Sequence, residues 1–267
     1  EDASLIHVNV DELEINKNRQ VDFAILGDAK LVLMQMIEAV KRILGGGGRG
    51  KDEHLTREIE RVKEEWLEEW MPKLTSDEVP INPFRVTWDL MHTVDRRNTI
   101  VIHDAGLPRW HVSHHYEALF PRGYIGMGGE SEMGWSLGAA MGAKLANPDK
   151  LVINIMGDGA FGMTGLDLET AVRNSIPILT VVSNNSGLGQ YFERTPSTAA
   201  LSGHYAKVAE GLGAYAERVE KPEEIIPSVE RAKKALGAGR PALLEIITKV
   251  EGTEEIRAYW KDFKAVG

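Results

Sequence analysis

From about residue 84 onward, the chain alternates short apolar runs with longer helical stretches. Four runs are rich in β-branched residues and are bounded by polar or turn-forming residues. They are TIVIHD at 99–104, LVINIM at 151–156, IPILTVVSNN at 176–185 and ALLEIIT at 242–248. Continuous apolar strands between helices are typical of a parallel sheet that is covered on both faces. The pattern therefore predicts a doubly wound α/β domain over residues 81–250.

The pattern before that domain is different. LIHVNV at 5–10 predicts a buried strand, and KLVLMQMIEAVKRIL at 30–44 predicts a helix with one apolar face. Because the chain begins within a strand pattern, we interpret residues 1–44 as the end of another α/β domain. We expect the rest of that domain to lie upstream or on another polypeptide.

A connecting segment of linker and charged helix is predicted over residues 45–80. The run Gly45–Gly48 breaks the preceding helix and is typical of a flexible linker. Apolar residues then recur every three or four positions, at Leu55, Ile59, Val62, Trp66 and Trp70. This spacing places them on one stripe of a helix, which we expect to pack against the following domain. Residues 251–267 remain as a C-terminal tail.

Composition argues against several classes of protein. The net charge of −9 disfavours a nucleic-acid partner, which needs a basic face. The 267 residues include no cysteine, so disulfides, thiolate metal sites and a cysteine nucleophile are excluded. No apolar run approaches the roughly 18 residues of a membrane helix, and the first residues do not resemble a signal peptide. We therefore expect a cytoplasmic protein with neither a nucleic acid nor a membrane as partner.

Residues 157–162, GDGAFG, follow a predicted strand and precede a helix. They fit the glycine fingerprint G-x-G-x-x-G of a dinucleotide-binding turn. That fingerprint also needs an acidic residue at the end of the next strand, where this chain has Ser183, Asn184 and Asn185. In addition, Asp158 would repel a pyrophosphate. An NAD(P)-dependent oxidoreductase is therefore the weaker alternative.

A divalent cation would turn this repulsion into attraction. Asp158 and Asn185 follow two strands joined by a helix, and a right-handed crossover brings both strand ends to one edge of the sheet. Neighbouring strands lie about 5 Å apart, so a carboxylate and an amide oxygen can bind one ion there. Mg²⁺ favours oxygen ligands and is often shared with phosphates. The amides of Gly159 and Ala160, at the start of the helix, can receive phosphate oxygens. The spacing thus predicts a diphosphate carried on Mg²⁺.

This G-D-G and N-N arrangement resembles the cofactor-binding motif of thiamine-diphosphate-dependent enzymes. The resemblance implies thiamine diphosphate and Mg²⁺ as cofactors. It implies that the metal is bound by the side chains of Asp158 and Asn185 and by the carbonyl of Gly187. Gly157 and Gly106 belong to the cofactor contacts expected from the same resemblance. The implied fold is the thiamine-diphosphate-binding α/β fold, in agreement with the pattern of strands and helices.

A second segment carries the same resemblance. GMGGESEMGWSLGAAMGAKLANP at 126–148 is similar to the segment that precedes the motif in acetolactate synthases and 2-hydroxyacyl-CoA lyases. In these enzymes the residue at the Met133 position wedges between the two cofactor rings, and main-chain groups at Met133 and Ser131 bind the aminopyrimidine. The loop GLPR at 106–109 departs from the glutamine and histidine that contact the diphosphate in acetolactate synthases. AFG followed by GLDLETA, at 160–162 and 165–171, favours instead the acyl-CoA lyase and decarboxylase branch. The branch therefore stays open.

The resemblance implies a thiamine-diphosphate-dependent lyase or transferase that breaks or joins C–C bonds of 2-keto acids or 2-hydroxyacyl-CoA. By this resemblance residues 1–44 end the family's central domain, and 81–250 form its pyrophosphate-binding domain. The family's catalytic glutamate lies on a pyrimidine-binding domain, which no segment here resembles, so no catalytic residue is assigned in this chain. We expect a partner domain or subunit to supply it within a homo- or hetero-oligomer, a dimer or tetramer, that acts on a small-molecule substrate. A non-catalytic cofactor-binding subunit is the other alternative.

Five further residues are candidates on their position alone. His111, His114 and His115 can share one helix face, where packing or substrate contact is favoured over a metal site. Gln190 and Tyr191 follow the metal-binding loop, and we predict that they face the substrate.

Overall fold

The computed structural model divides the chain into two compact units, Glu1–Glu65 and Trp66–Gly267. The division falls within helix α2 (Glu53–Leu74). The residues described are 3–45, 50–127, 132–189 and 196–252. Most of the predicted glycine linker, at 46–49, and most of the predicted C-terminal tail, at 253–267, lie outside them.

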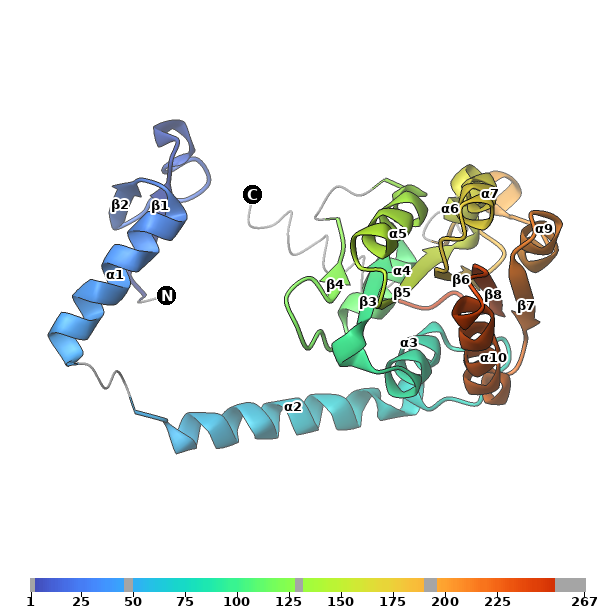
Figure 1. Ribbon diagram of the computed structural model, residues 1–267. Coiled ribbons are helices and arrows are strands. Elements are labelled where there is room, and N and C mark those ends of the chain that lie inside the picture. The colour runs from blue at the N-terminus through green and yellow to red at the C-terminus, as the bar shows by residue number, and fades with distance from the viewer. Residues whose placement is uncertain (1–2, 46–49, 128–131, 190–195, 253–267) are drawn as a thin grey trace. The chain divides into compact units, whose positions relative to one another are not determined.

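The first unit contains two parallel strands, β1 (Ile6–Asn9) and β2 (Phe23–Leu26), followed by helix α1 (Ala29–Leu44) (Figure 1). Asp28 caps this helix, since its carboxylate accepts a hydrogen bond from the Leu31 amide at 3.0 Å. The pattern predicted one strand before the helix and missed β2. This strand is four residues long and mostly exposed, so it lacks the apolar run that marks a buried strand.

The second unit is built on a six-stranded parallel sheet with the strand order β4-β3-β5-β6-β8-β7 (Figure 1). Its strands are β3 (Thr99–His103), β4 (Tyr124–Ile125), β5 (Leu151–Gly157), β6 (Leu179–Asn184), β7 (Tyr215–Val219) and β8 (Ala242–Ile247). Its helices beyond α2 are α3 (Pro83–Thr93), α4 (Leu107–Ser113), α5 (Trp135–Ala146), α6 (Asp158–Thr164), α7 (Leu168–Arg173), α8 (Pro196–Ala199), α9 (Tyr205–Gly211) and α10 (Ile225–Gly237). The predicted doubly wound α/β fold is confirmed.

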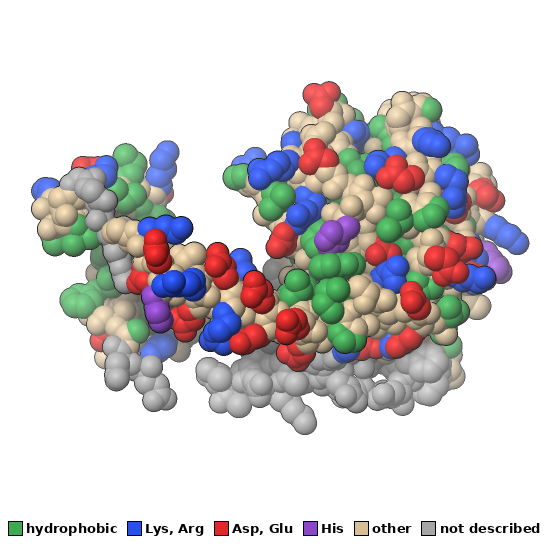
Figure 2. Space-filling view, turned by 90° about the horizontal axis from the view of Figure 1, so that it is seen from below, with side chains coloured by type: hydrophobic (Ala, Val, Ile, Leu, Met, Phe, Trp, Pro, Cys, Tyr) green, Lys and Arg blue, Asp and Glu red, His purple; other side chains and the backbone are tan. Residues whose placement is uncertain are grey.

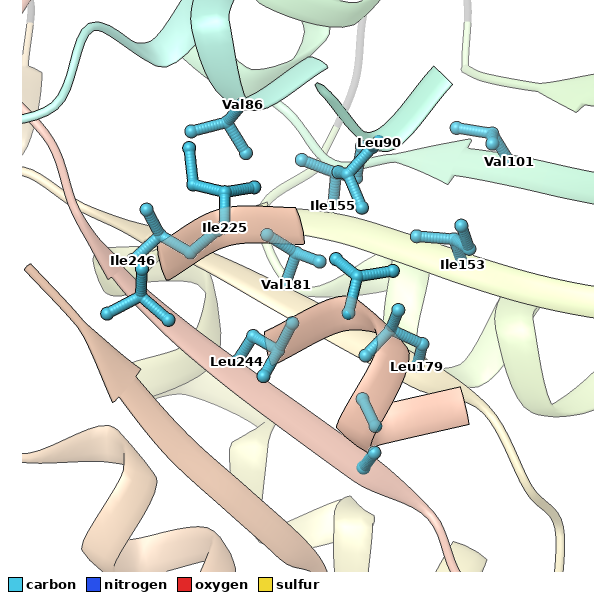
Figure 3. Packing of buried hydrophobic residues seen from close by; sticks show 14 of the residues in the cluster. Val86, Leu90, Val101, Ile153, Ile155, Leu179, Val181, Ile225, Leu244 and Ile246 are labelled. Atoms are coloured by element: carbon cyan, nitrogen blue, oxygen red, sulfur yellow. The ribbon is translucent and has the colours of Figure 1, made fainter. Parts of the chain in front are cut away.

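Helices bury both faces of this sheet. In β5, Ile153 and Ile155 belong to the hydrophobic cluster on the α3 and α10 side, whereas Val152 and Met156 belong to the cluster on the opposite side. Figure 3 shows the first cluster, in which strand residues pack against side chains such as Val86 of α3. Burial on both faces explains why the central strands are apolar without alternation.

The pattern missed the two edge strands, β4 and β7. Strand β4 has only two residues, and in β7 only Val219 is fully buried. An edge strand has one neighbour in the sheet and buries fewer side chains, so its sequence carries a weaker signal. The central strands lie where predicted, and their ends differ from the prediction by at most three residues.

Of the predicted apolar stripe of α2, Trp66 and Trp70 belong to the second unit and pack within it, whereas Leu55, Ile59 and Val62 belong to the first unit. The Trp70 ring lies 4.9 Å from the Phe84 ring of α3, and Trp66 stacks on His115 at 4.8 Å between ring centroids. These contacts explain the apolar stripe at this end of a helix that is otherwise strongly charged.

The surface carries charges of both signs. Figure 2 shows acidic and basic side chains interspersed with hydrophobic ones on the face that it presents. Within the described ranges, no helix combines the length and the apolar character needed to cross a bilayer.

Candidate functional site

Three loops meet at the carboxyl ends of the central strands and line one pocket. They follow β3, β5 and β6, and the segment just before α5 adds Met133 to the lining. Strands β5 and β6 are parallel neighbours, and Gly157 is paired with Ser183 at their ends. Ligand sites of open α/β sheets lie at such strand ends. The loops that carry the predicted metal ligands are therefore adjacent, as expected for two strands joined by a right-handed crossover.

Asp158 is the central polar residue of this pocket. It begins α6 and its side chain is buried, with only 2% of the residue exposed. One carboxylate oxygen accepts from the Gly159 amide at 2.8 Å and the other from the Gly187 amide at 3.0 Å. Burial raises the pKa of Asp158 to about 6, although these backbone donors act in the opposite direction. Among the described residues, no lysine or arginine forms an ion pair with it.

Asn185 lies beside Asp158 at the end of the next strand. Its Oδ1 accepts from the Gly187 amide at 3.1 Å, so both side chains converge on Gly187. All three residues line the pocket. The structure thus brings together the side-chain oxygens of two predicted metal ligands, of the kind that Mg²⁺ prefers. At Gly187 it is the amide that meets them, and the carbonyl, the predicted third ligand, accepts from the Gly189 amide at 2.9 Å.

Asn184, the other member of the Asn-Asn pair, has a different environment. Its Nδ2 donates to Glu245 at 2.8 Å, and its Oδ1 accepts from the Ser186 amide at 2.9 Å. Glu245 is fully buried in β8 and also accepts from Arg218 at 2.8 Å and from the Ala206 amide at 3.0 Å. Asn184 therefore supports the turn that presents Asn185. The sequence analysis missed Glu245, whose signal was a charged residue within an otherwise apolar strand.

Two glycines allow the loops of the pocket to close on one another. A Cβ atom on Gly159 would lie 2.6 Å from Leu188 and 3.0 Å from the terminal carbon of Met133. A Cβ atom on Gly189 would lie 2.4 Å from a methyl group of Leu107. Larger residues at either position would push these loops apart.

The other residues that the sequence predicts to contact the cofactor lie in different environments. Met133 is 36% exposed and lines the pocket with Gly159 and Gly106. Ala160 packs in the hydrophobic layer on one face of the sheet, and Gly157 ends β5. The Gly159 amide, predicted to receive a phosphate, donates to Asp158 here. Three predicted contacts, Ser131, Gln190 and Tyr191, lie outside the described residues.

The three histidines take part in packing. His115 is buried between the rings of Trp66, Trp70 and Phe84, and neither of its ring nitrogens has a hydrogen-bond partner among the residues described. Burial lowers the pKa of His115 to about 4, with smaller effects of the neighbouring His114 and His111.

The other two histidines bond to the backbone. His111 bonds through Nε2 to the Glu251 carbonyl at 2.9 Å, and His114 bonds through Nδ1 to the Trp110 carbonyl at 3.1 Å. In the described part of the chain, no group of three or more acidic or histidine side chains is arranged to hold a metal ion.

A comparison with protein families decides which ligand this pocket fits. Residues 104–246 match the family described as "Thiamine pyrophosphate enzyme, C-terminal TPP binding domain", and TPP is thiamine diphosphate. The chain belongs to this family. The match contains Asp158, Asn185 and Met133, and it confirms the resemblance drawn from the sequence. It favours thiamine diphosphate over a nicotinamide dinucleotide as the ligand.

Relatives of known name agree with this assignment. The chain is 32% identical over 258 residues to a protein of Methanococcus aeolicus named "Probable acetolactate synthase large subunit", covering 91% of this chain and 42% of that protein. It is 31% identical over 262 residues to the "Acetolactate synthase large subunit" of Corynebacterium glutamicum, covering 92% of this chain and 40% of the relative. The chain thus spans about two fifths of the length of the curated relatives it matches.

The residues of the pocket fit a thiamine diphosphate domain. A buried carboxylate with a raised pKa faces an amide side chain across Gly187, so a divalent cation would find oxygen ligands and would stabilise the ionised acid. Leu107, Leu188 and Met133 supply an apolar wall beside this polar end. Such a pocket suits a ligand that is charged at one end and aromatic at the other.

Proposed function

We propose that this chain is the cofactor-anchoring part of a Mg²⁺- and thiamine-diphosphate-dependent enzyme that joins or breaks C–C bonds. The observation that carries the proposal is the meeting of Asp158, Asn185 and Gly187 in one pocket. The family match and the names of the relatives support it.

The polar end of the pocket would hold the metal. The ligands would be the side chains of Asp158 and Asn185 and the carbonyl of Gly187. The Gly187 amide donates to both side chains, which holds them close together before a metal arrives. A pocket organised in advance lowers the cost of ordering these groups on binding.

Thiamine diphosphate, when bound, would supply a nucleophilic carbon and a cationic ring that serves as an electron sink for C–C bonds next to a carbonyl group. The residues of this chain would bind, orient and shield. Asp158 and Asn185 would anchor the diphosphate through the metal, and Met133 would set the orientation of the organic half. Leu107 and Leu188 would exclude water, which strengthens electrostatic interactions within the site.

The proposed substrates are 2-keto acids, since the relatives are named acetolactate synthases. A 2-hydroxyacyl-CoA is the second candidate, because the loop Gly106–Arg109 lacks the glutamine and histidine of acetolactate synthases and because of the GLDLETA segment at 165–171. The catalytic glutamate would come from a pyrimidine-binding domain on a partner domain or subunit. A non-catalytic cofactor-binding subunit is the alternative if no such partner restores activity.

Calorimetry with the chain of residues 1–267 tests the metal-binding part of the proposal. We expect thiamine diphosphate to bind in the presence of Mg²⁺ and not in the presence of EDTA. Asp158→Ala should weaken binding more than about a hundredfold, because losing even a supporting partner of a metal ligand costs about ten- to a hundredfold. Asp167→Ala, which removes an exposed carboxylate that makes no capping hydrogen bond, is the matched control. Unchanged affinity in Asp158→Ala, or tighter binding of NAD, would contradict the proposal.

A further inference from the structure

A second buried carboxylate, Asp104, lies next to the pocket and has no role in the proposed metal site. It follows β3 directly, and none of its surface is exposed. Its neighbours in the chain, from Ala105 to Pro108, line the pocket. In the sequence this aspartate ends the apolar run TIVIHD at 99–104, and no motif there points to a function for it. A fully buried acid is costly unless its oxygens are well bonded, so its partners show what it does.

The partners of Asp104 come from its own loop and from the segment before α5. Its oxygens accept from the Ala105 amide at 2.8 Å, from the Gly134 amide at 3.0 Å and from the Ser136 amide at 3.1 Å. The Ser136 hydroxyl also donates to it. In the described ranges, no lysine or arginine is paired with this acid. Backbone and hydroxyl donors therefore satisfy its carboxyl oxygens.

The contact with Gly134 connects Asp104 to Met133. The Gly134 amide and the Met133 carbonyl belong to one peptide group, which is planar, and the only cis bond in the described chain is Val79–Pro80. In a trans peptide the N–H and the C=O point in opposite directions. By holding this N–H, Asp104 directs the Met133 carbonyl away from itself.

The same stretch of backbone is held from the other side as well. The Thr164 hydroxyl, at the end of α6, donates to the Gly134 carbonyl at 3.0 Å. Gly134 has a φ of +92°, and a Cβ atom there would lie 2.6 Å from Thr164. The N–H of Gly134 is thus held by Asp104, just after β3, and its C=O is held by Thr164 at the end of α6. A residue before the clamp, such as Met133, has little freedom to reorient its backbone.

We propose that Asp104 is a positioning residue, which orients the Met133 backbone so that it can bind the aminopyrimidine half of thiamine diphosphate. This inference rests on the proposed function. Among the described residues, the donors that Asp104 binds belong to the loop after β3 and the start of α5, and none belongs to the loops of Asp158 and Asn185. We therefore expect Asp104 to act more on the organic half of the ligand than on the diphosphate and metal.

Two ligands that share the diphosphate separate an effect on the organic half of the cofactor from an effect on the diphosphate and metal. The probes are thiamine diphosphate and inorganic diphosphate, each titrated calorimetrically with Mg²⁺ into the chain of residues 1–267. Asp104→Asn keeps the shape of the side chain but places an N–H₂ group against the amide donors. We expect it to weaken thiamine diphosphate binding about tenfold, as lost bonds to a charged group should, and to change diphosphate binding less than about twofold.

Two further variants test whether a loss of affinity comes from the position of the Met133 backbone or from the removal of any buried carboxylate. Asp89→Asn is the matched control, since Asp89 is a buried carboxylate of α3 that pairs with Arg85 at 2.8 Å. It should leave the ratio of the two affinities unchanged. Ser136→Ala removes the hydroxyl donor but keeps the amides, and we expect a smaller selective loss than in Asp104→Asn. Thermal unfolding of each variant checks that it is folded at the temperature of the titration.

The outcomes distinguish this inference from the proposed function. A wild-type chain that binds neither ligand with Mg²⁺ overturns both. If the wild type binds both ligands, the inference is overturned when Asp104→Asn loses both affinities in parallel, or loses neither. It is also overturned when Asp89→Asn shows the same selective loss. A selective loss in Asp104→Asn alone supports it.

Discussion

At the scale of single residues, Met133 and the polar residues of the pocket have different proposed roles. Its side chain reaches over Gly159, whereas Asp158 and Asn185 meet at Gly187. The polar residues therefore determine whether a diphosphate and metal can be held. Met133 would determine the conformation in which the rest of the cofactor is held.

We expect Met133→Ala to retain binding of thiamine diphosphate while lowering kcat in the assembled enzyme. Orientation of the cofactor rings matters more in the transition state than in the ground state, so the loss should fall on the chemical step. Calorimetry gives Kd, and a coupled assay gives kcat. Met163→Ala, at an exposed methionine of α6, should leave both unchanged. A parallel loss of affinity and kcat in Met133→Ala would argue that the residue only contributes binding.

At the level of elements, the turn after α4 joins α2 and α3 through an aromatic cluster. His115 lies among Trp66, Trp70 and Phe84, and its ring nitrogens make no hydrogen bond among the described residues. An uncharged imidazole packs there as a flat apolar ring. A proton on it would place a charge in this cluster, close to His111 and His114.

This packing predicts a pH-dependent stability. The pKa of His115 is lowered to about 4, so below about pH 6.5 the unfolded chain binds a proton that the folded chain does not. The stabilisation is therefore complete above pH 6.5 and is lost as the pH falls toward 4, at up to about 1.4 kcal/mol per pH unit. Urea unfolding between pH 7 and pH 5 should show a shallower loss in His115→Phe than in the wild type. His204→Phe, at an exposed position, should keep the wild-type slope. Equal slopes in the wild type and His115→Phe would show that His115 is not the responsible group.

At the level of the whole molecule, the chain holds a cofactor pocket but has no assigned catalytic acid or base. It spans about two fifths of the length of its acetolactate synthase relatives, 42% and 40% in the two cases described. The domain that we propose to carry the catalytic glutamate is outside the family match at 104–246. The pocket side that bears Met133 would then face a partner, across an interface larger than the roughly 1,000 Å² of a specific contact.

We therefore predict that residues 1–267, supplied with thiamine diphosphate and Mg²⁺, do not turn over 2-keto acids by themselves. Decarboxylation or carboligation of pyruvate should begin when a pyrimidine-binding domain with its glutamate is added. The same domain with that glutamate changed to glutamine is the control, and it should bind without restoring turnover. Sustained turnover by the chain alone, as a monomer in solution, would refute the split site.

The sequence by itself determined the central strands of the sheet and one edge of the site. Apolar runs on two-sided strands marked the central sheet, and a carboxylate and an amide placed after two successive strands indicated a shared ligand. The central strands and the proximity of these two side chains are confirmed, because they depend on periodicity and on the handedness of one crossover, which are local properties. The shared ligand itself stays a prediction. The short strands β2, β4 and β7 were missed because they bury too little to leave a pattern.

Only the tertiary structure decided which side chains act together. It assigned Asn185 to the pocket and Asn184 to Glu245, which lies 61 residues further along the chain. It also placed Asp104 against Gly134, 30 residues away, and His115 against the tryptophans of α2. The strand order and the packing of helices on the sheet set these contacts. A buried polar group bonds to whichever donor the fold brings within about 3 Å, and local sequence does not encode that distance.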